Sequence, residues 1–243
     1  MKTFRLIRSE PASATYNMAM DEKIFFRFMK DHIPVFRIYG WQTPSFTYGV
    51  SQRPARELNM VHCIKDGVKI VKRMTGGGVL FHNQEITYSL SCSKDDVGEE
   101  KNVFISYRKI CAFLIYFYES LGLKPSFACE ADDFESKSLG HPLCTASQEK
   151  YDILINNKKI GGNAQKRNRH DLFQHGSIPL SHDWELMRRY LRILPEGVLA
   201  GNTSLSEELK DMSSRKVLEQ KLIDAVVNVF NINFIEEEEP LSS

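Results

Sequence analysis

Apolar and polar residues alternate in several short segments of the chain, a pattern typical of strands with one buried face. Turn signals such as Asp66-Gly67 separate neighbouring segments. The pattern therefore predicts a protein rich in short β-strands. The predicted strands cover residues 4–7, 34–39, 45–50, 68–71, 79–82, 86–91 and 231–235, with a hairpin between 151 and 165.

Apolar residues spaced three and four positions apart predict helices between these strands. The clearest helix covers residues 102–122, where Ile110, Leu114, Phe117 and Leu121 share one face. Residues 124–150 show no period and are expected to be irregular, and the acidic run at 236–239 is expected to be a solvated end. Further helices are predicted over residues 13–29, 184–191 and 214–230.

The predicted hairpin has an Asn156-Asn157 pair at its centre. Asparagine tolerates the positive φ that a tight turn requires, so the pair marks the turn. Lys159 follows directly, beside Gly161-Gly162. Two glycines weaken a strand unless another backbone or a ligand comes close. Lys159 is therefore a candidate ligand-facing residue, and the alternative is an ordinary surface lysine.

Composition limits the class of protein. The 243 residues are 42% hydrophobic and 26% charged, which is typical of a globular protein with a large core. Without repeats or a compositional break, the strands and helices predict one α+β domain over residues 1–243. The net charge of +1 gives no reason to expect nucleic acid or an anionic membrane as a partner.

The five cysteines are scattered, odd in number and contain no CxxC pair, which argues against a disulfide framework and a structural zinc site. The chain shows neither a signal peptide nor an uninterrupted run of 18 apolar residues, so a cytoplasmic location is expected. Cysteines 63, 92, 111 and 129 lie in or beside apolar patterns and are expected to pack in the core. Cys144 lies instead in a polar loop, where it is either another packing residue or an exposed nucleophile.

Residues 73–78 (RMTGGG) interrupt two predicted strands. Consecutive glycines let backbone N–H groups converge on an anion or a carbonyl, and Arg73 adds charge. The alternative is a flexible hairpin. His82 follows on the next strand, and His175-Gly176 lies on a later one. Each histidine either packs in the fold or lines the same pocket.

Taken together, these motifs resemble the lipoate-attachment family, which includes lipoate–protein ligases and cysteine-dependent octanoyl transferases and is related in fold to biotin–protein ligase. The order and spacing of the matching segments make the resemblance specific. They are residues 17–22, 36–39, 49–52, 73–82, 159–165 and 175–178.

The resemblance implies a central mixed sheet flanked by helices, with a tunnel for a medium-chain acyl group and no bound metal in the protein itself. The glycine loop would form one wall, and Lys159 would reach the acyl carbonyl. The product would be an amide on a lysine of a lipoyl carrier domain. The substrate-binding residues implied are Arg73, Thr75, Gly76, Gly77, Gly78, His82, Gly161, Gly162, Asn163, Ala164 and His175.

Two reactions fit this family. In the first, Cys144, seven residues before Tyr151-Asp152 as in the transferases, takes an octanoyl group from octanoyl-acyl carrier protein and needs no cofactor. In the second, a ligase uses ATP and Mg²⁺ to activate free lipoate as an adenylate. The Tyr151-Asp152 pair replaces the Asn-Asp typical of ligases, which favours the transferase. The acceptors would be glycine cleavage H protein or the E2 subunit of 2-oxoacid dehydrogenases.

A basic loop after the hairpin holds Lys166, Arg167 and Arg169. Such clusters are usually solvated turns. Because lipoyl domains are commonly acidic, we expect this loop to steer the acceptor by long-range attraction.

Overall fold

The computed structural model describes residues 1–98, 103–130, 149–194 and 197–240. A six-stranded mixed sheet forms the centre, in the order β10-β11-β6-β2-β1-β12. Its strands are β1 (Lys2–Arg8), β2 (Val35–Tyr39), β6 (Glu85–Ser93), β10 (Gly162–Arg167), β11 (Asp171–Pro179) and β12 (Ile232–Glu236).

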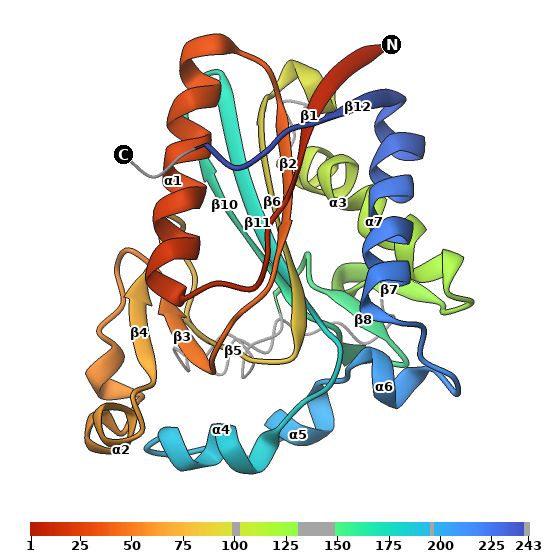
Figure 1. Cartoon of the computed structure of the whole chain (residues 1–243). Coiled ribbons are helices and arrows are strands. Elements are labelled where there is room, and N and C mark those ends of the chain that lie inside the picture. Colours follow the sequence, from red (N-terminus) through yellow and green to blue (C-terminus); the bar gives the residue numbers. More distant parts are fainter. Residues whose placement is uncertain (99–102, 131–148, 195–196, 241–243) are drawn as a thin grey trace.

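Helices cover both faces of this sheet (Figure 1). Helix α1 (Ala14–Asp31) lies on one face, and α3 (Val103–Ser120) and α7 (Arg215–Phe230) lie together on the other. The largest apolar cluster lies between α3, α7 and the sheet, because each helix presents a buried apolar stripe. On the opposite face, Phe25 and Phe28 of α1 pack against Phe173 of β11. The predicted α+β fold with a central mixed sheet flanked by helices is confirmed.

Two smaller sheets lie at the lower end of the central sheet in Figure 1. One has the order β4-β3-β5 and the other the order β7-β8-β9. Their strands are β3 (Ser45–Tyr48), β4 (Lys69–Lys72), β5 (Val79–His82), β7 (Pro125–Phe127), β8 (Ile153–Ile155) and β9 (Lys158–Lys159). Short helices border them: α2 (Met60–Lys65), α4 (Trp184–Tyr190), α5 (Val198–Gly201) and α6 (Leu205–Glu208).

Most predicted elements are present, with ends that shift by a few residues. The Asn156-Asn157 turn is confirmed, since both residues have positive φ between β8 and β9. The segment after it differs from the prediction: it is two strands in two sheets, divided at Gly161, whose φ is +77°. The expectation that residues 124–150 are wholly irregular is also wrong, because β7 pairs with β8 there. Asn102, the predicted start of α3, lies outside the described residues.

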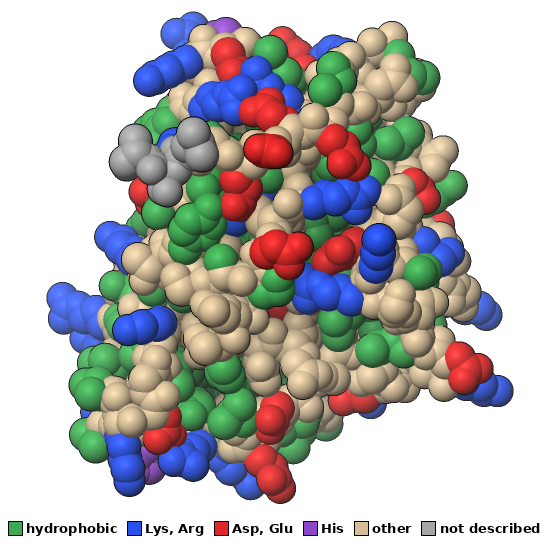
Figure 2. Space-filling view, viewed as in Figure 1, with side chains coloured by type: hydrophobic (Ala, Val, Ile, Leu, Met, Phe, Trp, Pro, Cys, Tyr) green, Lys and Arg blue, Asp and Glu red, His purple; other side chains and the backbone are tan. Residues whose placement is uncertain are grey.

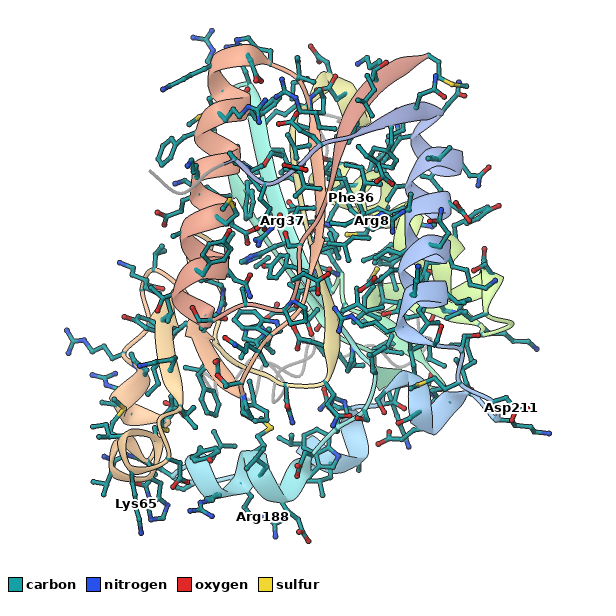
Figure 3. The ribbon with its side chains drawn as sticks, in the orientation of Figure 1. Arg8, Phe36, Arg37, Lys65, Arg188 and Asp211 are labelled. Atoms are coloured by element: carbon teal, nitrogen blue, oxygen red, sulfur yellow. The ribbon has the colours of Figure 1, made fainter. Side chains whose placement is uncertain are left out.

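The acidic run at the end of β12 is only partly solvated: Glu236 and Glu238 are exposed, whereas Glu237 and Glu239 are folded against the protein. Glu237 pairs with Arg5 and Arg27, and Glu239 reaches Arg37, whose side chain is fully buried. Arg37 lies beside Phe36 at the centre of the molecule (Figure 3). The C-terminal segment therefore reaches a buried polar cluster that also touches the candidate site described below.

The surface around this segment carries interleaved acidic and basic side chains (Figure 2). This arrangement agrees with the net charge of +1. Within the described ranges, no helix is both long and apolar enough to cross a membrane.

Candidate functional site

The glycine-rich loop is held by a close backbone approach at Gly49, just after β3. A Cβ built on Gly49 would lie 2.2 Å from the Gly77 carbonyl oxygen, and the next residue, Val50, donates its N–H to the Thr75 carbonyl at 3.1 Å. No larger side chain fits this position without moving the loop. The sequence thus places glycine where two backbone segments must meet.

Replacing Gly49 by alanine is therefore expected to displace the loop, at a cost of about 1–3 kcal/mol of stability. We also expect the catalytic efficiency of the folded variant to be lower than that of wild type. Urea unfolding together with steady-state kinetics would measure both effects. Gly201→Ala is the matched control, because a Cβ there meets no atom within 4 Å. Wild-type kinetics in folded Gly49→Ala would contradict the role of this contact.

The Arg73 side chain folds into the loop and is surrounded by the loop's own polar groups. Its guanidinium is buried and donates to the carbonyls of Gly76 and Gly78, each at 2.7 Å. It also donates to the hydroxyls of Thr75 at 3.2 Å and Thr47 at 3.3 Å. A planar group with five donors can hold several acceptors in a fixed geometry. Arg73 therefore fixes the shape of the loop.

The Thr75 hydroxyl begins a chain of hydrogen bonds that ends at a buried carboxylate. Thr75 Oγ1 lies 2.8 Å from His175 Nε2, and His175 Nδ1 lies 3.4 Å from Asp21 Oδ2. Because a carboxylate only accepts, Nδ1 carries the ring proton and Nε2 accepts from the threonine. Asp21 in turn accepts from Arg37 Nη1 at 3.1 Å.

The Thr47 hydroxyl begins a second chain of the same order. Thr47 Oγ1 lies 2.7 Å from His82 Nε2, and His82 Nδ1 lies 2.9 Å from Glu85 Oε1. Trp41 stacks on the His82 ring at 3.9 Å and donates its indole N–H to Glu85 at 2.9 Å. Two threonine–histidine–carboxylate chains thus converge on the guanidinium of Arg73.

These buried groups have shifted pKa values. Burial alone would raise the pKa of Asp21, but its bond with His175 and the charge of Arg37 outweigh burial and lower it. Burial likewise opposes ionisation of Glu85, and contacts with His82 and Thr87 lower its pKa overall. Burial lowers the pKa of His175 below 6.5 despite Asp21. The native state therefore binds fewer protons than the unfolded chain in mild acid.

Stability is expected to fall in two stages as the pH is lowered. Below about pH 6.5 His175 becomes protonated in the unfolded chain but stays neutral in the native state, because its native pKa is lowered. Below about pH 4.5 the same holds for Asp21 and Glu85, which stay ionised in the native state. In both stages the unfolded state binds more protons, so the sign is the same. Urea-unfolding free energies between pH 3 and pH 8 would show it, and a flat profile over that range would contradict it.

A pocket lies between the glycine loop and the strands β10 and β11. Met18, Trp41, Leu80 and Ala164 give it apolar walls, while Asn163 adds a polar side chain. Its space, open mouth included, is about 440 Å³. We call this the glycine-loop pocket. The predicted residues that line it are Arg73, Gly77, His82, Gly162, Asn163, Ala164 and His175.

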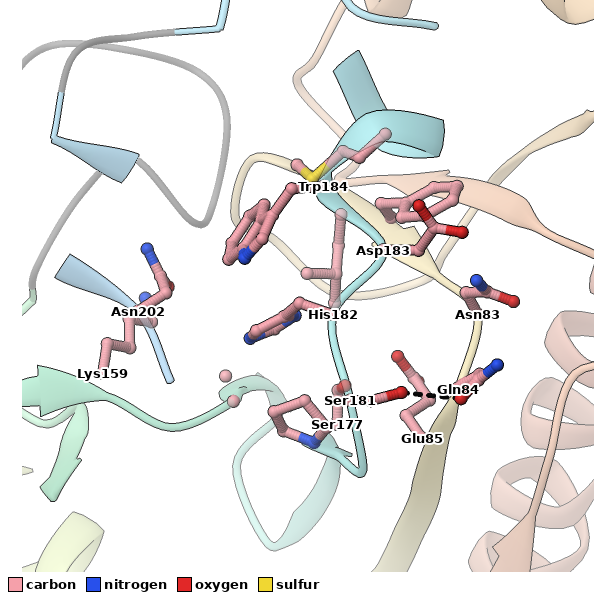
Figure 4. A pocket seen from close by; sticks show the side chains of 16 residues that line it. Asn83, Gln84, Glu85, Lys159, Ser177, Ser181, His182, Asp183, Trp184 and Asn202 are labelled. Atoms are coloured by element: carbon pink, nitrogen blue, oxygen red, sulfur yellow. Dashed lines mark hydrogen bonds between the residues drawn. The ribbon is translucent and has the colours of Figure 1, made fainter. Parts of the chain in front are cut away.

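A second pocket adjoins the first and shares Leu80, Gly162 and Ser177 with it. Its space is about 610 Å³, and Lys159 and Asn202 form one side (Figure 4). We call this the lysine pocket. Predicted residues Lys159, Gly161 and Gly162 line it, whereas Thr75, Gly76 and Gly78 line neither of the two pockets. All three accept from Arg73, and Thr75 also bonds His175.

Lys159 is buried and ion-paired. Its Nζ lies 2.7 Å from Asp152 Oδ2, and both side chains are at most about one-tenth exposed. Gly161 turns the chain away from Lys159 with a positive φ, and a Cβ there would lie 2.0 Å from the Ser177 carbonyl oxygen. This close approach to backbone explains one of the two glycines. The reading of Lys159 as a surface residue is excluded, whereas Lys158 is exposed.

Gly176 allows a close approach between β11 and the predicted hairpin segment. It lies opposite Asn163 in the β10–β11 pair, and a Cβ on it would lie 2.1 Å from Asn163 Oδ1. Asn163 Oδ1 also accepts from the Tyr88 hydroxyl at 2.7 Å. The glycine thus makes room for a fixed Asn163 side chain at the pocket.

The predicted nucleophile Cys144 lies outside the described residues, so its position remains a prediction. Of the other cysteines, Cys63, Cys92 and Cys111 are buried, as expected of packing residues. Burial raises the pKa of Cys111 to about 12 and also raises that of half-buried Cys129. These two thiols are poor nucleophiles at neutral pH.

Several side chains of the candidate site were not singled out as site residues from the sequence. Asp21, Thr47 and Glu85 anchor the two chains, and Asp152 pairs with Lys159. One signal was available: Thr47 is a polar residue within a predicted strand, and Glu85 directly precedes another. Among the described residues, no three His, Cys, Asp or Glu side chains gather to hold a metal ion.

The predicted basic loop is only partly a loop, because Lys166 and Arg167 are the last two residues of β10 and Arg169 lies in the turn to β11. At strand spacing, Arg167 lies roughly 17 Å along β10 from Gly162. Arg167 bonds Gln165 and Ser106, while residues 166 and 169 are exposed. Its suggested role in steering the acceptor stays a prediction.

Several curated proteins are similar over nearly the whole chain. Octanoyltransferase LipM of Kyrpidia tusciae is 32% identical over 238 residues, covering 95% of this chain and 86% of that protein. LipM of Bacillus cereus is 31% identical over 239 residues (94% and 84%), and LipM of Clostridioides difficile is 27% identical over 245 residues (97% and 90%).

Solved structures share the fold. A lipoate-protein ligase A bound with ATP superposes with a TM-score of 0.81 at 21% identity, covering 98% of this chain and 89% of that one. A bi-partite lipoate protein ligase from Thermoplasma acidophilum gives a TM-score of 0.77 at 19% identity, covering 98% and 88%. Residues 13–231 match the lipoyl protein ligase A/B catalytic domain. The resemblance noted in the sequence is thus confirmed, and the chain belongs to the lipoyl protein ligase A/B catalytic domain family.

Proposed function

We propose that this protein is an octanoyltransferase of protein lipoylation that works through a thioester on Cys144. The observation that carries the proposal is the similarity to octanoyltransferases LipM over more than nine-tenths of the chain. The likeness to ligases is at 21% identity or less and extends to the fold alone.

The two adjoining pockets suit such a reaction. The apolar walls of the glycine-loop pocket would bury a medium-chain acyl group. Lys159, in the lysine pocket next to it, would donate a hydrogen bond to the acyl carbonyl. A buried cation there stabilises the negative oxygen that forms when a nucleophile attacks the carbonyl.

The reaction has two steps. The thiolate of Cys144 attacks the thioester carbonyl of octanoyl-acyl carrier protein, a new C–S bond forms, and the carrier thiol leaves. The acceptor lysine then attacks the Cys144 thioester, an amide forms, and the Cys144 thiol is released. The thioester supplies the driving force, so the scheme requires no nucleotide and no metal ion.

The proposed partners follow from this chemistry. The donor is octanoyl-acyl carrier protein, and the acceptors are lipoyl domains such as glycine cleavage H protein or the E2 subunit of 2-oxoacid dehydrogenases. A nearly neutral net charge gives no basis for a nucleic-acid partner.

A comparison of acyl donors tests the proposal. Purified protein and a lipoyl domain would be incubated with octanoyl-acyl carrier protein, or in parallel with free lipoate, ATP and Mg²⁺, and the lipoyl domain would be weighed by mass spectrometry. We expect modification with the carrier-bound donor and none that depends on ATP. ATP-dependent loading of free lipoate, with no transfer from the carrier, would establish the ligase alternative instead.

A further inference from the structure

We propose that His182 is the base that accepts a proton from the ammonium group of the acceptor lysine before that lysine attacks the acyl-enzyme. The inference rests on the proposed two-step transfer and concerns its second step. It assigns a role to a residue outside every motif that carried the family resemblance.

His182 lines the lysine pocket together with Lys159 and Asn202 (Figure 4). Thr203 joins the two sides: its carbonyl accepts from His182 Nε2 at 3.0 Å, and its N–H donates to the Lys159 carbonyl at 2.9 Å. A single residue of backbone therefore fixes the imidazole relative to the lysine that we place at the acyl carbonyl.

The same hydrogen bond determines the tautomer. A carbonyl oxygen only accepts, so Nε2 carries the proton and Nδ1 of the neutral ring presents a lone pair. Trp184 packs against the ring at 4.4 Å between centroids and limits its rotation. An acceptor side chain entering the pocket would thus meet a proton acceptor in a fixed orientation.

The surroundings keep this ring neutral. Burial lowers the pKa of His182 below 6.5, outweighing the bond to Thr203 and the carboxylates of Glu207 and Glu85, which favour the charged form. The pocket is also lined by a basic residue, Lys159, and an acidic residue, Asp183. A neutral imidazole at pH 7 can take up a proton, as a general base must.

Two other titratable groups of the pocket, Lys159 and Glu85, are poorly suited to this step. Lys159 donates to Asp152 and supplies a cation rather than a lone pair. Glu85 Oε1 already accepts from Trp41, His82 and Thr87, and its lowered pKa makes it a weak base.

The proton balance of the step is simple. His182 Nδ1 takes one proton from the acceptor ammonium, leaving a neutral amine. The amine forms a C–N bond to the octanoyl carbonyl, the C–S bond to Cys144 breaks, and the second nitrogen proton passes to the sulfur. The imidazolium then releases its proton to solvent, so each turnover yields one amide, one thiol and one proton.

His182→Gln tests the proposal, because a glutamine amide can still donate to the Thr203 carbonyl but has no basic lone pair. Enzyme would first be acylated with octanoyl-acyl carrier protein, and single-turnover transfer to a lipoyl domain would be followed from pH 5 to pH 9. We expect acylation within about threefold of wild type and transfer at pH 7 slowed by about 10²–10⁴-fold.

The pH profile separates a base from a merely structural residue. Wild-type transfer should rise to a plateau above a pKa below 6.5. Transfer by His182→Gln should instead keep rising by about tenfold per pH unit, since it then depends on the small fraction of neutral lysine. A wild-type profile that rises in this way throughout would overturn the proposal, whether or not the variant folds.

Two controls complete the design. Hydroxylamine is already neutral at pH 7 and should cleave the acyl-enzyme of both proteins equally, which shows that the thioester is intact and accessible. His170→Gln, on the exposed β10–β11 turn, should transfer at the wild-type rate. Equal transfer rates for His182→Gln and wild type would overturn the inference alone. Failure of wild type to form any acyl-enzyme would overturn the proposed function.

Discussion

Lys159→Met is expected to lower turnover by about 10²–10³-fold, the loss usual when one donor to a developing oxyanion is removed. Methionine keeps most of the apolar stem but removes the ammonium group that lies 2.7 Å from Asp152. Because both partners are buried, the unpaired carboxylate should also cost about 3–5 kcal/mol of stability. Steady-state kinetics and urea unfolding, run on the same preparation, would separate these effects.

The neighbouring lysine provides a matched control. Lys158 precedes Lys159 in β9 but is exposed, so Lys158→Met should leave both kinetics and stability close to wild type. Equal losses in the two variants, or full activity in folded Lys159→Met, would show that Lys159 does not act on the acyl carbonyl.

Cys144→Ser is expected to reduce transfer from octanoyl-acyl carrier protein by at least ~10⁴-fold, as is usual when a catalytic nucleophile is removed. A serine hydroxyl of nearly the same size has no accessible anion at neutral pH, whereas a thiol has. Loss of activity would be read from the mass of the lipoyl domain over time.

Cys129→Ser is the control for this variant, because the half-buried Cys129 thiol has a raised pKa and lies near Glu130. The Cys129→Ser variant should therefore retain wild-type activity. Full activity of Cys144→Ser with this donor would rule out Cys144 as the site of the thioester.

Local sequence patterns predicted most of the secondary structure, because each strand or helix reveals its buried face within a few residues. The Asn156-Asn157 turn was predictable for the same reason: two positive-φ residues are a local requirement. The division of the following segment at Gly161 was not, since it depends on contact with Ser177 in another strand.

The hydrogen-bond chains around Arg73 depend on contacts that no local pattern encodes. Thr75 and His175 lie 100 positions apart in the sequence, and His175 and Asp21 lie 154 apart. The motifs identified Arg73, His82 and His175 as candidates. The structure adds the carboxylates that fix the tautomers of the two histidines, and the threonines that connect each histidine to Arg73.

The acidic C-terminal run shows a related limit. Four consecutive glutamates usually mark a solvated segment, yet Glu239 lies 3.0 Å from buried Arg37 and accepts from the Tyr16 hydroxyl at 2.7 Å. Arg37 also holds Asp21. Through Arg37, residue 239 is thereby connected to Asp21, which anchors the glycine loop. This connection could not be predicted without knowing where the buried Arg37 side chain lies.

The mass of the intact protein after incubation with octanoyl-acyl carrier protein, without acceptor, tests the central claim most directly. We predict that wild type gains the mass of one octanoyl group, that the gain maps to a peptide containing Cys144, and that a lipoyl domain then removes it. Absence of this adduct in wild-type protein, or an adduct of the same yield in Cys144→Ser, would contradict the account.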